Sequence, residues 1–140
     1  MSDRSLVDTN VFVYMFDADA PKKRAIAREL VDGGARRGTL VLSAQVLGEF
    51  YVTVTQKLAK PLAPADAARA VKNLAALPLL PVDAGAVIAA VARSQSDKIA
   101  YWDALLVETA RAGGCAELLT EDLQDGRDFD GLHVVNPFRR

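Results

Sequence analysis

Short apolar runs alternate with helical segments along the chain, and this alternation limits the fold more than any other feature. Runs this short and apolar are typical of strands that are buried on both faces of a sheet. Strands separated by helices predict an α/β fold with a parallel sheet between two helical layers. We expect strands, or in one case an extended link, at residues 5–7, 39–42, 79–82, 117–120 and 133–135.

Helices are expected between these strands, and several carry capping residues at their ends. Ser43 and Asp83 precede helical segments, where a side-chain oxygen accepts hydrogen bonds from first-turn N–H groups. Pro21 suits the first turn of a helix. The predicted helices span residues 11–16, 21–35, 44–60, 64–77, 84–94 and 100–112.

The length and charge of the chain limit its class. A chain of 140 residues fits one domain, and no repeat or linker divides it, so we expect a single domain over residues 1–140. The chain has 17 Lys and Arg against 18 Asp and Glu, a net charge of −1. This balance excludes a strongly basic nucleic-acid-binding module, whose pI usually exceeds about 9. It leaves open whether some acids cluster.

The chain has one cysteine, Cys115, and one histidine, His133. They exclude an internal disulfide and a zinc site built from Cys and His. A bound metal would therefore have oxygen ligands, which favours Mg²⁺ or Mn²⁺. No run reaches the length of a membrane span, and the first residues show no signal-peptide core. We therefore expect a cytoplasmic protein with no membrane contact.

Four acidic residues lie where ligands of parallel sheets bind, beyond the carboxyl ends of the strands. Asp8 ends the first strand, and Glu49 lies in the helix after the second. Asp103 lies early in a later helix, and Asp122 follows the strand that ends at Thr120. Carboxylates brought together in this way repel one another unless a cation lies between them. The sequence therefore predicts a divalent metal site at this edge.

Three of these acids have apolar neighbours in the chain. Asp8, Glu49 and Asp103 each lie within apolar segments, where an unpaired carboxylate costs several kcal/mol. Helix caps, ion pairs or a solvent-facing position explain any one of them, but explain all three together less well. The fourth acid is less certain, because Glu121 and Asp125 lie in the same loop as Asp122.

Together these segments resemble the PIN-domain proteins, in particular the VapC-type toxin ribonucleases of type II toxin–antitoxin systems. No single segment is decisive, but their order and spacing form a strong signal. The matching segments are Leu-Val-Asp-Thr-Asn-Val (6–11), Ser-Ala-Gln-Val-Leu-Gly-Glu-Phe-Tyr (43–51), Tyr-Trp-Asp-Ala-Leu-Leu (101–106) and Leu-Leu-Thr-Glu-Asp-Leu-Gln-Asp-Gly (118–126).

The resemblance implies a three-layer α/β/α sandwich with a parallel sheet of about five strands. It also implies an Mg²⁺- or Mn²⁺-dependent endoribonuclease that leaves 3′-hydroxyl and 5′-phosphate ends. Asp8, Glu49, Asp103 and Asp122 would be both the catalytic residues and the metal ligands. The supporting positions would be Thr9, Asn10, Thr120 and Asp125.

RNA contacts are expected from basic and aromatic side chains near these motifs. The basic candidates are Lys22, Lys23, Arg24 and Arg28, although such a cluster is more often a solvated helix face. Aromatic residues near the motifs, Trp102 among them, can stack on bases, but core packing is the favoured role for most of them.

The resemblance also implies partners: a cognate VapB-type antitoxin, an RNA substrate and a second copy in a homodimer. Val13 and Phe16 are candidates for the antitoxin groove or for the core. Two other functions stay open. A haloacid-dehalogenase-like phosphatase also has an Asp after its first strand, but needs a second Asp where this chain has Asn10. The other is an interaction domain that has lost catalytic activity.

Overall fold

The computed structural model describes residues 3–139, in which six strands form one sheet. The order across the sheet is β3-β2-β1-β4-β6-β5, and every neighbouring pair is parallel except the antiparallel pair β5 and β6. The strands are β1 (Ser5–Val7), β2 (Leu40–Ser43), β3 (Leu79–Leu80), β4 (Glu117–Leu119), β5 (Asp128–Phe129) and β6 (Leu132–Val135).

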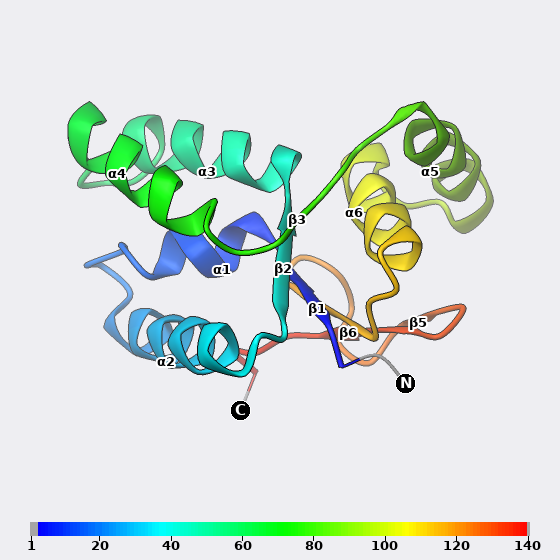
Figure 1. The fold of residues 1–140 in the computed structure, drawn as a ribbon, viewed down its shortest axis with the longest axis horizontal. Helices are drawn as coiled ribbons and strands as arrows, with labels where there is room; N and C mark the ends of the chain where they lie inside the picture. Colours follow the sequence, from blue (N-terminus) through cyan, green and yellow to red (C-terminus); the bar gives the residue numbers. More distant parts are fainter. Residues whose placement is uncertain (1–2, 140) are drawn as a thin grey trace.

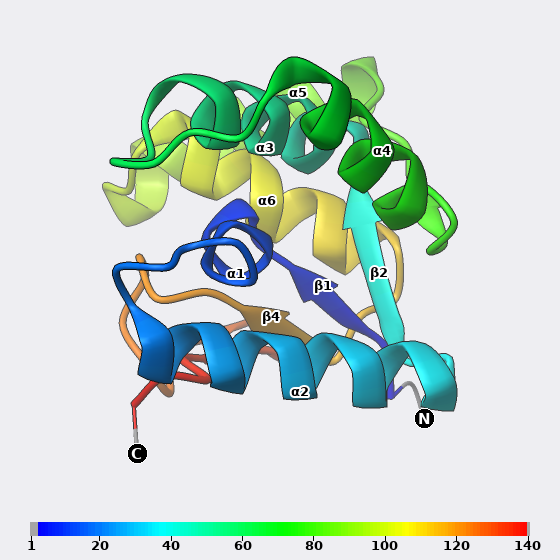
Figure 2. The same ribbon diagram turned by 90° about the vertical axis from the view of Figure 1, so that its left-hand side faces the viewer.

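Helices cover both faces of this sheet. Figure 1 shows α1 to α4 on one side of β2, and α5 and α6 on the other. In the turned view, α1 lies between α2 and α3 (Figure 2). The predicted α/β/α arrangement is therefore confirmed. The helices are α1 (Thr9–Tyr14), α2 (Pro21–Arg37), α3 (Ala44–Gln56), α4 (Pro64–Leu74), α5 (Ala84–Asp97) and α6 (Tyr101–Ala112).

The predicted helix caps at Ser43 and Asp83 are confirmed. Ser43 Oγ accepts a hydrogen bond from the N–H of Val46 (3.3 Å), and Asp83 Oδ1 accepts one from Ala86 (2.9 Å). Helix α1 begins two residues earlier than the predicted start at residue 11, because Asp8 caps it.

The antiparallel strand β5 was not predicted, so the sheet differs from the expected five parallel strands. Its hairpin turns at Asp130 and Gly131, which both have positive φ (55° and 100°). Asp128 Oδ1 accepts a hydrogen bond from the Gly131 N–H at 2.7 Å and stabilises this turn. Two-residue strands of this kind are too short to show an alternating pattern in the sequence.

The core fills the space between the sheet and the helices. Gly34 allows α2 to approach β2, since a Cβ there would lie 2.4 Å from Leu40 Cγ. Val13 is buried, and Phe16 packs against the Phe50 ring with centroids 5.7 Å apart. The structure therefore places Val13 and Phe16 in core packing. Within residues 3–139, no helix is both long and apolar enough to cross a membrane.

Candidate active site

The strand order brings three strand ends together at one edge of the sheet. Strand β1 lies between β2 and β4, and all three run in the same direction. Asp8 follows β1, Glu49 lies on the helix that follows β2, and Asp122 lies just after β4. This is the edge at which parallel sheets bind ligands.

Asp8 is buried, and its two shortest hydrogen bonds come from Thr120 and Thr9. Val7 pairs with Leu119 in the parallel ladder, so the next residues, Asp8 and Thr120, lie side by side. Thr120 Oγ1 donates to Asp8 Oδ2 at 2.8 Å, and the Thr9 N–H donates to Asp8 Oδ1 at 2.7 Å. The carboxylate therefore has a fixed position as well as a capping role.

Asn10 connects Asp8 to Asp122. Its Nδ2 lies 3.1 Å from Asp122 Oδ2, 3.3 Å from Thr120 Oγ1 and 3.4 Å from Asp8 Oδ2. The Asp122 N–H also donates to Thr120 Oγ1 at 3.1 Å. The side-chain oxygen of Asn10 is buried and has no hydrogen-bond partner among residues 3–139. One amide and one hydroxyl thus hold two acids near each other.

Glu49 reaches the same group from α3. Thr9 Oγ1 lies 3.3 Å from Glu49 Oε2, and Gln45 Nε2 donates to Glu49 Oε1 at 2.6 Å. A cavity of about 330 Å³ is lined by Thr9, Asn10, Glu49 and Asp122 among others. Gln45 was not among the predicted site residues, although its spacing of four residues from Glu49 on a helix is a usable signal.

The four acids interact electrostatically. The pKa of Asp8 is raised to about 6: burial is the largest cause and the charges of Asp122 and Glu49 add to it, while the hydrogen bonds from Thr120 and Thr9 lower it. The pKa of Asp103 is also raised, first by burial and then by the charges of Asp122 and Glu49. Negative charge is therefore concentrated here without a compensating cation from residues 3–139.

The structure separates the three candidates for the fourth acid. Asp122 lines the cavity, whereas Glu121 turns to α1 and α2: it accepts hydrogen bonds from Tyr14 OH (2.5 Å) and Lys23 Nζ (2.9 Å). Asp125 accepts a hydrogen bond from the Asn136 N–H at 2.8 Å. Asp122 is thus the acid of this loop that lines the cavity, whereas Asp125, predicted as a supporting residue, accepts its hydrogen bond from the backbone of Asn136.

Comparison with known proteins identifies the family. A family model described as the PIN domain matches residues 5–128, most of the chain. The chain belongs to the PIN domain family. A search of curated proteins found no match for it.

Solved structures share the fold of this PIN domain. A toxin–antitoxin complex from Klebsiella pneumoniae matches with a TM-score of 0.71 and 22% identity, over 95% of this chain and 97% of that chain. The structure of FitAB bound to a DNA fragment matches with a TM-score of 0.70 and 20% identity, over 97% of this chain and 96% of that chain. A Mycobacterium tuberculosis VapC toxin that cleaves the sarcin–ricin loop matches with a TM-score of 0.59 and 18% identity, over 81% of this chain and 86% of that chain. At these identities the similarity establishes the fold.

Among the four basic residues predicted to bind RNA, two have structural partners within this PIN domain and two have no ion pair in the described part of the chain. Lys23 forms an ion pair with Glu121 and lies 4.8 Å from the centre of the Tyr14 ring. Arg28 Nε donates to the Met15 carbonyl at 2.8 Å. Lys22 and Arg24 have no ion pair within residues 3–139. Two of the four predicted cations therefore have structural partners.

The donors at the site suit a hard divalent cation. Carboxylate oxygens and the buried Asn10 carbonyl are the ligand types that Mg²⁺ and Mn²⁺ prefer. A cation would also offset the charges that raise the pKa of Asp8 and Asp103. In residues 3–139, no three acidic, His or Cys side chains already surround a single ion position. The PIN domain thus presents a group of acids rather than a closed cage.

Proposed function

We propose that this PIN domain is a metal-dependent endoribonuclease that hydrolyses RNA phosphodiester bonds. The observation that carries the proposal is the convergence of four carboxylates, from four elements, at the carboxyl edge of the sheet. Burial and mutual repulsion raise the pKa of both Asp8 and Asp103, and within residues 3–139 the charges that act on these two acids are negative. Membership of the PIN domain family supports a nuclease role.

Asp8, Glu49, Asp103 and Asp122 would hold Mg²⁺ or Mn²⁺. When bound, such an ion lowers the pKa of a coordinated water and neutralises charge on the phosphate. Thr120 and Asn10 support the site by fixing Asp8 and Asp122 through the hydrogen bonds described above. Such outer-sphere partners orient the acids before a ligand arrives.

The residue two positions after Asp8 argues against a haloacid-dehalogenase-like phosphatase. That mechanism needs a second carboxylic acid to donate a proton, and this chain has Asn10 there. Its amide donates hydrogen bonds to Asp122 and Asp8 instead. An amide does not act as a general acid at neutral pH, so Asn10 fits a positioning role better.

We further propose that the activity is that of a toxin, restrained by a VapB-type antitoxin. One similar structure is a toxin–antitoxin complex, and another holds FitAB on DNA. The acid group supports this proposal, because an Arg or Lys of a partner would pair with Asp8 and Asp122 and displace a metal. We also propose a homodimer, on the basis of the family resemblance. Sedimentation velocity would measure the molar mass in solution and test this.

The experiment incubates the purified protein with end-labelled single-stranded RNA and, separately, with a small phosphomonoester. The proposal predicts internal cleavage of RNA with Mg²⁺ or Mn²⁺, products with 5′-phosphate ends, and no cleavage in EDTA. Release of phosphate from the monoester without RNA cleavage would favour the phosphatase. Tight antitoxin binding without cleavage of any RNA would favour the inactive interaction domain.

A further inference from the structure

Trp102 is exposed close to the acid group, and it is one of the aromatic residues for which the sequence left base stacking open. Its side chain lies on the first turn of α6, next to Asp103, and is 62% exposed. The indole packs edge to face against Tyr101, with ring centroids 4.9 Å apart and an angle of 72°. One face of a large aromatic ring is therefore left to solvent next to a proposed catalytic residue.

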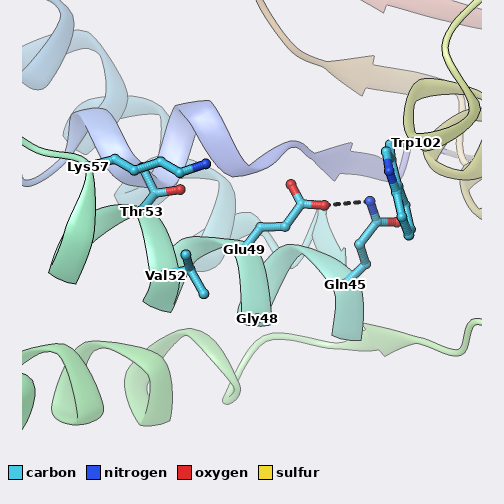
Figure 3. Close-up of a pocket in the computed structure, with 7 residues that line it drawn as sticks. All are labelled: Gln45, Gly48, Glu49, Val52, Thr53, Lys57 and Trp102. Atoms are coloured by element: carbon cyan, nitrogen blue, oxygen red, sulfur yellow. Dashed lines mark hydrogen bonds between the residues drawn. The ribbon is translucent and has the colours of Figure 1, made fainter.

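Trp102 forms one end of a groove along α3, which we name the Trp102–Lys57 groove. The groove has a volume of about 640 Å³, and Glu49 and Thr53 lie in its wall. The same two residues line the cavity of the acid group, so the two depressions adjoin along Glu49 and Thr53. Figure 3 shows Trp102 beside Gln45 at one end, Lys57 at the other, and Glu49 between them.

Lys57 lies at the opposite end of the groove. The Lys57 ammonium has no ion pair or hydrogen bond with any residue in the range 3–139. Lys57 lies 12 positions after Gln45, which corresponds to about 18 Å along a helix axis at about 1.5 Å per residue. Several stacked nucleotides, at about 3.4 Å each, fill that distance.

We infer that the Trp102–Lys57 groove binds single-stranded RNA next to the bond that is cut. The Trp102 indole stacks on a base, the Lys57 ammonium contacts a phosphate, and the strand between them passes Glu49. The inference rests on the proposed nuclease function. An aromatic face combined with a cation suits a nucleic acid strand, because bases stack and phosphates carry charge. An apolar protein segment would contact Val52 and Trp102 but would leave the Lys57 ammonium without a partner, and the binding test below distinguishes it from RNA.

Trp102 is the single tryptophan of the chain, so the protein's tryptophan fluorescence reports on this groove alone. The binding test uses an Asp8→Asn background with Mg²⁺, in which RNA is not cut. Its probes are a labelled single-stranded oligoribonucleotide of about ten nucleotides and an abasic strand of equal length. The RNA should quench the emission, and the abasic strand should not. An unchanged emission at saturating RNA would overturn the inference and point to another occupant.

Substitutions separate the two contacts. Trp102→Ala should weaken RNA binding about fivefold or more, with little effect on the abasic strand, and Trp102→Phe should keep most of the affinity. Lys57→Ala should weaken binding of both strands and reduce the slope of log K against log salt by about 0.7. Matched controls are Ile88→Ala on α5 and Arg36→Ala on α2. They remove an exposed apolar residue and an exposed cation outside the groove lining, and should change neither the affinity for RNA nor the salt slope.

Cleavage kinetics distinguish failure of the groove from failure of the nuclease. In the otherwise natural sequence, Trp102→Ala should raise KM by a similar factor and leave kcat within about twofold. If Trp102→Ala cleaves RNA in a metal-dependent manner with an unchanged KM, the inferred role of the groove is wrong and the proposed nuclease function stands. If the natural sequence cleaves no RNA, the proposed nuclease function is wrong, and the inferred role of the groove is wrong as well.

Discussion

Thr120 Oγ1 donates a 2.8 Å hydrogen bond to Asp8 Oδ2 across 112 positions of sequence. The parallel ladder accounts for the contact, because Val7 pairs with Leu119 and the two following residues then lie side by side. Both side chains are buried, so solvent competes little for the bond. The ladder that builds the sheet therefore also fixes the position of the first acid of the site.

Replacing Thr120 by Val should disturb Asp8 while keeping the side-chain volume. Loss of the hydroxyl donor should raise the pKa of Asp8 above its value of about 6 in the metal-free protein, as NMR titration would measure. RNA cleavage should fall about 10- to 100-fold, as for other outer-sphere partners. Thr109→Val is the control, because the buried Thr109 hydroxyl has no partner within residues 3–139. Equal pKa values in the two variants would contradict the role of Thr120.

Asp8→Asn should stabilise the metal-free protein at high pH while abolishing activity. Burial raises the folded pKa of Asp8 from 3.8 to about 6, so the folded state favours the protonated carboxyl. Its stabilising contribution is full below pH 3.8 and is lost as the pH rises through about 6. Two units of pKa correspond to about 3 kcal/mol. Urea unfolding in EDTA should show the variant more stable than the natural sequence at pH 8, with no such advantage at pH 3.5.

Glu121 and Asp122 should respond differently to removal of their charge. Asp122 lines the acid cavity, so Asp122→Asn should weaken Mn²⁺ binding at least about tenfold, as calorimetry would measure. Glu121 binds Lys23 and Tyr14 instead, so Glu121→Gln should leave Mn²⁺ affinity within about twofold. The opposite order of effects would make Glu121 the fourth acid.

Arg93 should be important for stability. Its side chain is 12% exposed and forms ion pairs with Asp97 (2.9 Å), Glu108 (3.1 Å) and Asp130 (3.0 Å), which join α5, α6 and the β5–β6 turn. Arg93→Met leaves Glu108 only partly compensated and should lower the free energy of unfolding by about 3 kcal/mol.

The matched control for Arg93 is an arginine in an exposed ion pair. The Arg69 and Asp66 side chains are 70% and 53% exposed, so Arg69→Met should cost less than about 1 kcal/mol. Urea unfolding at one pH compares the two variants. Equal losses of stability would show that the Arg93 ion pairs contribute no more than an exposed one.

The sequence predicted the arrangement of strands and helices because apolar runs and caps are local signals. Ser43 and Asp83 illustrate this, since each caps the helix that begins immediately after it. The positions of Asp8 and Asp122 near one sheet edge followed from the rule on strand ends. The hairpin at Asp130 was missed, because a two-residue strand has no detectable period.

The contacts within the site depend on register and side-chain direction, which the sequence does not encode locally. Thr120 was predicted as a supporting residue from the family resemblance, but its bond to Asp8 needs the parallel register of β1 and β4. Pairing of Lys23 with Glu121 joins residues 98 positions apart and had no local signal. Trp102 lies in the first turn of α6, and the sequence alone did not show whether its ring faces the core or the solvent; the structure exposes it.

The most direct test of the account compares cleavage of one single-stranded RNA by the natural sequence, Asp8→Asn, Asp103→Asn and Asp32→Asn, with Mg²⁺ and with EDTA. Asp32 is an exposed acid on α2 and serves as the matched control. The account predicts Mg²⁺-dependent cleavage by the natural sequence and Asp32→Asn. It predicts losses of about 100-fold or more for Asp8→Asn and Asp103→Asn, beyond the effect of an outer-sphere partner. Equal cleavage by all four proteins, or cleavage that persists in EDTA, would contradict it.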